Sequence, residues 1–186
     1  MKNIFLWSII IMGVLLIGGI ATVRAGEEAV PTIRELPEEV VLFALFKGSY
    51  ENIGPRIGKL YGVAGQKGIR PGKPLSFSYL NDHQIISSEG WLTEIRIPVG
   101  KDALKYAGKL GKMADVKVLP ARKVAVAIKA PGQSDRGLIE KSLMDWIASN
   151  GYSSTGVVTE VFLSNAQSGD YAQMKSEIII QLTETL

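Results

Sequence analysis

The sequence matches itself when it is shifted by 83 residues, and the match needs no gap. The dipeptide Leu36-Pro37 then falls on Leu119-Pro120, and Glu94-Ile95-x-Ile97 falls on Glu177-Ile178-x-Ile180. Self-similarity at a fixed period is the signature of a structural unit that is present more than once. We therefore expect two copies of one unit joined by a linker. The predicted ranges are 33–99 for the first copy, 100–115 for the linker and 116–183 for the second copy.

Each predicted unit has the element order β-α-β-β. Short apolar runs rich in β-branched and aromatic residues predict buried strands, and apolar residues at helical spacing predict a helix after the first strand. In the first unit these elements are a strand over 40–46, a helix from Ile53 to Gly68, and strands over 75–79 and 91–99. In the second unit they are a strand over 123–129, a helix capped by Ser134 or Asp135 that ends at Asn150-Gly151, and strands over 157–163 and 174–182.

The last strand of each unit carries a carboxylate on the face opposite its apolar side chains. Side chains alternate along a strand, so Ile95 and Ile97 point to one face while Glu94 points to the other. Ile178 and Glu177 repeat this division in the second unit. The apolar face should lie under the helices. We therefore expect an α+β fold in which the duplicated units form a pseudo-two-fold antiparallel sheet assembly, with a central cleft that two glutamates enter.

Composition excludes several classes of chemistry. The chain has no Cys and one His, so disulfides and thiolate nucleophiles are absent, and a multi-histidine metal site or a Ser-His triad is not expected. One basic residue lies in the first 20 residues, which leaves 20 basic against 18 acidic residues in the remainder. This near-balance predicts no nucleic-acid partner. We expect no metal and no cofactor, and any chemistry must use carboxylates, hydroxyls and aromatic rings.

An uncharged apolar segment, Ile4 to Val23, precedes the predicted units. Its 20 residues would form a helix of about 30 Å, which is enough to cross a bilayer. The alternative is a cleavable signal peptide, with Val23-Arg24-Ala25 as the cleavage site. Because the apolar run is longer than the usual signal-peptide core, we interpret residues 1–25 as a single-pass N-terminal transmembrane anchor. The flanking Lys and Arg do not decide the orientation, and the default places the domain on the exported, periplasmic or extracytoplasmic, side.

Several motifs in the two units occur in a characteristic order and spacing. They are Leu36-Pro37, Gly48-x-Tyr50-Glu51, Glu94-Ile95-Arg96-Ile97-Pro98-Val99, Trp146-Ile147-x-x-x-Gly151-Tyr152 and Glu160-Val161-Phe162-Leu163. With these motifs, residues 33–183 resemble the GyrI-like or AraC-type effector-binding domain, which is a duplicated β-α-β-β module. No helix-turn-helix segment accompanies the motifs, so the sequence does not support the transcription-factor role of some relatives.

The resemblance implies that bulky, often cationic, aromatic compounds bind in the cleft between the repeats. It assigns the ligand contact to a glutamate of the final strand, here Glu177, and the internal repeat adds Glu94. A carboxylate among aromatic rings is a suitable cation receptor, because an organic cation offsets the cost of desolvating it. The expected aromatic walls of the cleft are Tyr50, Tyr79, Trp91 and Phe162.

Structural roles are the alternative for each of these residues. Glu94 could pair with a neighbouring cation such as Arg96, Glu177 could be solvated on the sheet surface, and each ring could belong to the core or the rim. Trp146 is expected in the core because it lies on the apolar face of the second predicted helix. His83 is expected in an exposed turn.

Three functional classes fit these observations. The first is a membrane-tethered module that captures or senses bulky cationic aromatic or amphiphilic small molecules. The second is a glutamate-dependent hydrolase of reactive xenobiotics, for which a general base must have a raised pKa and hold a water. Phe162 stands where hydrolytic relatives have a Tyr, and we assign no catalytic residue. The third is a scaffold that uses the same cleft for a lipid or an unidentified protein partner.

Overall fold

The computed structural model describes residues 30–83, 85–132, 135–163, 171 and 174–183. Within these ranges no helix is long and apolar enough to cross a membrane. The apolar segment Ile4 to Val23, for which an anchor helix is expected, lies outside the described residues.

The helices and strands of the first half recur in the second half after 83 residues. In the first half the elements are β1 (Thr32–Leu36), β2 (Glu39–Lys47), α1 (Ile53–Lys67), β3 (Ser76–Tyr79) and β4 (Leu92–Pro98). In the second half they are β5 (Asp115–Leu119), β6 (Arg122–Lys129), α2 (Arg136–Ser149), β7 (Ser153–Phe162) and β8 (Ser176–Thr183). Short 3-10 helices cover 50–52, 88–90 and 101–106. The α+β class is confirmed, and each half contains one strand more than the predicted order β-α-β-β.

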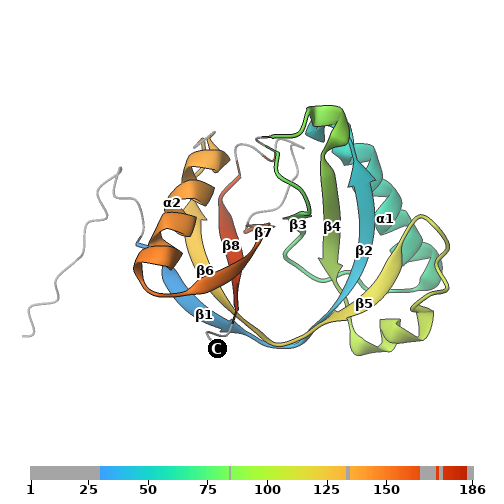
Figure 1. The fold of residues 1–186 in the computed structure, drawn as a ribbon. Coiled ribbons are helices and arrows are strands. Elements are labelled where there is room, and N and C mark those ends of the chain that lie inside the picture. Colours follow the sequence, from blue (N-terminus) through green and yellow to red (C-terminus); the bar gives the residue numbers. More distant parts are fainter. Residues whose placement is uncertain (1–29, 84, 133–134, 164–170, 172–173, 184–186) are drawn as a thin grey trace, which may run out of the picture.

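All eight strands form one antiparallel sheet with the order β1-β6-β8-β7-β3-β4-β2-β5. The extra strands are exchanged between the halves, because β1 pairs with β6 and β5 pairs with β2. In Figure 1 the chain crosses from β1 on the left to β2 on the right, and returns from β5 on the right to β6 on the left. The first strand predicted from the sequence covers residues 40–46, whereas the structure has an additional strand before it, β1, that begins at Thr32. The exchange explains the difference, since a five-residue strand is stabilised by a partner far along the chain.

Both helices pack on one face of the curled sheet, as Figure 1 shows. The side chains that α1 buries are Ile53, Ile57, Leu60 and Ala64, and those that α2 buries are Ile139, Leu143 and Ile147. They join a single core with the predicted apolar face of the sheet, which includes Ile95, Ile97, Ile178 and Ile180. The two halves therefore share one core. A smaller cluster of Val124, Val126 and Ile179, with Leu36 and Val161, lies on the opposite face.

The boundaries of α2 follow from local chemistry. Asp135 is the N-cap, and its carboxylate accepts a hydrogen bond from the backbone N–H of Leu138 at 3.2 Å. This confirms one of the two predicted caps. Gly151, with φ of +76°, follows the last turn, where a left-handed residue commonly ends a helix.

Helix α1 contains glycines that no packing requires. A Cβ atom added at Gly62, in the middle of the helix, would meet no atom within 4 Å. Gly68, by contrast, is the C-cap and has φ of +66°, a conformation that side chains disfavour.

We predict that Gly62→Ala raises the free energy of unfolding by about 0.5–1 kcal/mol, because alanine loses less backbone entropy in a helix. Gly68→Ala is the matched control at the end of the same helix. It should lower the free energy of unfolding by about 1 kcal/mol, because it forces an L residue into the left-handed region. Chemical denaturation of the two variants measures both effects. A stabilising Gly68→Ala would contradict the left-handed cap.

Candidate functional site

A cavity of about 350 Å³ lies on the helix side of the sheet, where the two halves meet. We call it the aromatic cavity. Its residues come from the turn before α1, from β3 and β7, from the end of β6 and from the start of α2. They are Tyr50, Ile53, Phe77, Tyr79, Lys129, Asp135, Arg136, Gly137, Glu160, Phe162 and Tyr171. Because β3 pairs directly with β7, each half contributes one of the two central strands beneath the cavity.

Aromatic rings form most of the apolar wall. Phe77 and Phe162 meet edge to face with ring centroids 4.7 Å apart, and Tyr171 lies 5.3 Å from Phe77 and 5.2 Å from Phe162. On the other side Tyr50 contacts Tyr79 edge to face at 5.7 Å. Such rings offer apolar area together with specific stacking geometry, which suits an aromatic ligand.

Glu160 places a buried carboxylate among these rings, with 5% of the residue exposed. The Tyr79 hydroxyl donates to its Oε2 atom at 2.8 Å, and the Ser176 hydroxyl donates to Oε1 at 2.6 Å. The ammonium of Lys129, itself 3% exposed, lies 3.5 Å from Oε1 and also donates to the carbonyl of Met174. Burial raises the pKa of Tyr79 well above its usual value, so its hydroxyl keeps the proton that it donates.

Arg136 adds a second cation at the first turn of α2. Its guanidinium lies 3.8 Å from the centroid of the Tyr79 ring and 5.7 Å from that of Tyr50, and it pairs with Glu140. Burial opposes the charged form, but the three neighbours Tyr79, Glu140 and Tyr50 raise the pKa of Arg136, so it stays protonated. Among the described residues that line the cavity the charges cancel, because Lys129 and Arg136 are matched by two carboxylates, Asp135 and Glu160.

His83 is half-buried beside the cavity, which contradicts the predicted exposed turn. Its ring stacks on Trp91 with centroids 5.0 Å apart and an interplanar angle of 15°. It also shares a hydrogen bond with the Tyr50 hydroxyl. Burial and the charge of Arg136 lower the pKa of His83 to about 4. The sequence prediction failed here because the loop between β3 and β4 folds His83 back onto Trp91 and brings it against Tyr50, which lies before α1.

The structure brings together only part of the predicted site. Tyr50, Tyr79 and Phe162 line the aromatic cavity, and Trp91 packs behind Tyr50 with ring centroids 4.9 Å apart. Glu94 and Glu177 lie on the opposite face of the sheet. One cleft therefore cannot combine these two carboxylates with the aromatic walls, and the combined site predicted from the sequence is corrected. The reason is strand alternation: Glu94 and Glu177 point away from the helix side that Ile95 and Ile178 face, whereas Tyr79 and Phe162 lie on the helix side.

Both of those glutamates have protein partners. Glu94 is 5% exposed and binds Arg96 at 2.6 Å and Lys117 at 2.7 Å, which is the structural role considered as the alternative. Glu177 forms a bidentate pair with Arg34, with distances of 2.8 and 2.9 Å. Glu177 also lines a larger cavity on the helix-free face of the sheet.

Glu160 is the carboxylate that the sequence prediction missed. The sequence contained a signal for it. Glu160 is two residues from both Val158 and Phe162, so it lies on the same face of β7, which is the apolar, helix-facing side. A charged residue on an apolar face is uncommon and marks a candidate site.

No family model matches the sequence, and no curated protein matches it. Its structure is similar to the EcmrR C-terminal domain, with 21% identity and a TM-score of 0.65 over 83% of this chain and 98% of that one. An uncharacterized conserved protein from Listeria innocua matches at 13% identity and a TM-score of 0.60, over 82% of this chain and 92% of that one. A hydrolase from Listeria innocua matches at 12% identity and a TM-score of 0.59, over 82% and 91%. The chain therefore has the fold of the EcmrR C-terminal domain.

We predict a strong energetic coupling between Glu160 and Lys129. Glu160→Gln should lower the free energy of unfolding by about 1–3 kcal/mol, because it removes a buried counter-charge of Lys129. Lys129→Met combined with Glu160→Gln should cost about 1–3 kcal/mol less than the sum of the single changes.

The control for this double-mutant cycle is the exposed pair Lys141–Asp145, whose side chains are 71% and 66% exposed at a separation of 2.6 Å. Its coupling should be about 0.5 kcal/mol or less. Chemical denaturation supplies all the free energies, and equal couplings for both pairs would contradict a buried Glu160–Lys129 interaction.

We predict that His83, the one histidine of the sequence, titrates near pH 4 in the folded protein. Because this folded-state pKa lies below the ordinary value of 6.5, protonation favours the unfolded chain. The stabilising contribution is complete above pH 6.5 and is lost as the pH falls toward 4. The imidazole resonances in an NMR titration measure the midpoint directly, and His83→Gln should flatten the acid side of the stability profile. A midpoint near 6.5 would mean that the ring is solvated.

Proposed function

We propose that this chain is a membrane-tethered small-molecule-binding protein that holds one bulky aromatic ligand in the aromatic cavity. The observation that carries the proposal is the lining of this cavity. Five aromatic side chains surround one buried, hydrogen-bonded carboxylate, Glu160, in a space of about 350 Å³. Ligand sites in proteins typically combine apolar and aromatic walls with a small number of fixed polar groups. The resemblance to GyrI-like domains, which bind aromatic compounds between their repeats, supports the same assignment.

The ligand that fits best is a neutral aromatic molecule. The preference for cations came from the family resemblance, which assigns the ligand contact to Glu177, and from Glu94 in the other repeat. Both glutamates lie outside the aromatic cavity. Inside it, Lys129 already neutralises Glu160, and the guanidinium of Arg136 already covers the face of Tyr79. An incoming cation would have to displace one of these charges, whereas a neutral ring would not.

The N-terminal segment supports a location at a membrane surface. If residues 4–23 span the bilayer, residues 24–31 connect the anchor to β1, and eight residues reach at most about 29 Å. The aromatic cavity would then stay close to the bilayer. Hydrophobic compounds concentrate there, which favours capture of a ligand that partitions into lipid.

Hydrolysis is less well supported by the geometry, although one structural neighbour is a hydrolase from Listeria innocua. Both carboxylate oxygens of Glu160 already accept hydrogen bonds, from Ser176 and from Tyr79. A general base must instead present an oxygen to a water or substrate. We therefore assign Glu160 to orienting a ligand and not to activating water.

We predict that acridine, neutral at pH 8, binds more tightly than N-methylacridinium, a cation of nearly the same shape. Fluorescence titration of the full chain with both compounds measures the difference. Phe162→Leu should weaken acridine binding about two- to tenfold, because one aromatic contact is worth about 0.5–1.5 kcal/mol. Tyr61→Leu is the control, since Tyr61 is an exposed aromatic residue of α1 outside the cavity.

Arg136→Met tests the charge argument separately. It uncovers the Tyr79 ring and leaves Glu140 without its guanidinium partner, so binding of N-methylacridinium should strengthen while that of acridine changes little. Tighter binding of the cation by the unmodified protein would restore the preference inferred from the sequence. If Phe162→Leu leaves acridine binding unchanged, the aromatic cavity is not the binding site.

A further inference from the structure

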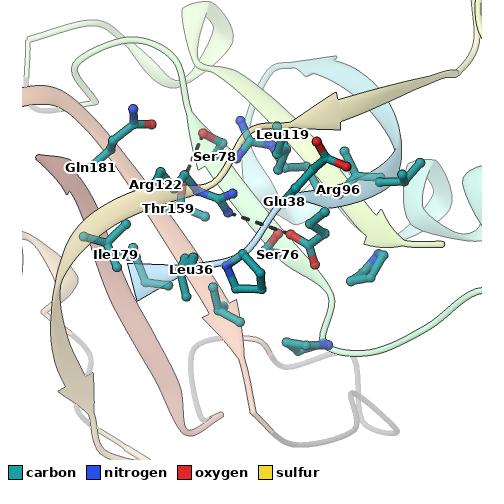
Figure 2. Close-up of a pocket in the computed structure, with 18 of the residues that line it drawn as sticks. Leu36, Glu38, Ser76, Ser78, Arg96, Leu119, Arg122, Thr159, Ile179 and Gln181 are labelled. Carbon is teal, nitrogen blue, oxygen red and sulfur yellow. Dashed lines mark hydrogen bonds and ion pairs between the residues drawn. The ribbon is translucent and has the colours of Figure 1, made fainter. Parts of the chain in front are cut away.

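A second cavity, of about 590 Å³, lies on the helix-free face of the sheet. We call it the back cavity (Figure 2). Its apolar wall includes Leu36, Val124, Val161 and Ile179, which belong to the small cluster on this face. Arginine side chains from different strands border the same space. A volume in this range accommodates a small organic ligand.

Two ion pairs in the lining of the back cavity are internally neutral. Arg34 binds Glu177 through two hydrogen bonds of 2.8 and 2.9 Å. Lys101 pairs with Glu38 at 3.3 Å. These four residues add no net charge, so the character of the cavity depends on the remaining charged groups.

Among the described lining residues, the remaining charged groups are Arg96, Arg122 and Glu39. The two arginines are largely withdrawn from water. Their side chains are 14% and 16% exposed, and Figure 2 shows them reaching the cavity from β4 and β6. The Nε atom of Arg96 donates to Glu94 at 2.6 Å. Arg122 has longer contacts, 3.8 Å to Glu39 and 3.3 Å to the carbonyl of Pro120.

The local charge around the two arginines is positive. Lys117 shares Glu94 with Arg96, so within the described part of the chain the three cations Arg96, Arg122 and Lys117 pair with two carboxylates, Glu94 and Glu39. The surplus is one positive charge. Burial lowers the pKa of Arg122; Glu39 opposes this effect, and the charge of Arg96 adds to it. A desolvated guanidinium with a distant counter-ion is costly, and an anion placed beside it removes that cost.

We propose that the back cavity binds an apolar monocarboxylate, with its carboxylate between Arg96 and Arg122 and its apolar body along Val124, Val161 and Ile179. A planar guanidinium matches a carboxylate through two parallel hydrogen bonds. Ser76, the cross-strand neighbour of Arg96, adds a hydroxyl to the polar end of the cavity. The single negative charge of the ligand balances the surplus of one positive charge around the two arginines.

The back cavity is independent of the aromatic cavity. Successive residues of β3 divide between them, because Phe77 and Tyr79 line the aromatic cavity while Ser76 and Ser78 line the back cavity. Each site can therefore be altered without changing the lining of the other.

The test is calorimetric titration of the full chain in lipid nanodiscs with octanoate, octanol and octylammonium, using empty nanodiscs as the blank. Octanoate should bind at least about tenfold more tightly than either analogue, because only the carboxylate forms charge-assisted bonds with the two arginines. Arg122→Gln should weaken octanoate at least about tenfold and leave octanol unchanged. Arg70→Gln, which alters an exposed arginine outside the cavity, should have no effect.

Two further variants keep the result decisive if Arg122→Gln folds poorly. Val161→Phe fills the back cavity and should abolish octanoate binding, whereas Phe162→Leu, on the other face of the same strand, should leave it intact. Three results would each overturn the proposal. They are equal affinity for octanoate and octylammonium, no binding of octanoate, and loss of octanoate binding in Phe162→Leu but not in the other variants. Because acridine reports the aromatic cavity and octanoate the back cavity, failure at one site is distinguishable from failure at the other.

Discussion

The antiparallel pairing of β3 with β7 is the contact on which both cavities depend. These strands come from different halves of the chain and join them into one sheet. Their register places Phe77 opposite Glu160, so aromatic side chains of the first half surround a carboxylate of the second. On the other face the same register sets Ser78 beside Thr159, whose hydroxyl donates to that of Ser78 at 3.2 Å. One pairing thus builds an aromatic site and a polar site back to back.

The charges in each cavity follow from the cost of burying ions. In the aromatic cavity the protein itself offsets the cost of desolvating these charges. Lys129 forms an ion pair with Glu160, and Arg136 lies over the ring of Tyr79. In the back cavity the offset is incomplete around Arg122. A site whose charges are already balanced favours a neutral ligand, and a site with a surplus cation favours an anion. Under the two proposals, the two faces of one sheet therefore select ligands of different charge.

Several features were predictable because they depend on neighbouring residues or on a repeated pattern. The shift of 83 residues anticipated that the helices and strands recur, and it holds for the extra strands β1 and β5 as well. Strand alternation correctly assigned Ile95 and Ile178 to the helix side and Glu94 and Glu177 to the other. The cap at Asp135 was predictable too, since a capping side chain bonds to a backbone group three residues away.

The sequence by itself determined the α+β class, the recurrence of its elements and the face to which Glu94 and Glu177 point, because these follow from local periodicity. Only the tertiary structure decided which strands meet. It exchanged β1 and β5 between the halves, placed Glu160 among rings from distant segments and packed the half-buried His83 against Tyr50. Contacts between residues far apart in the chain depend on the register of whole strands and on the packing of one shared core, and no short stretch of sequence carries that information.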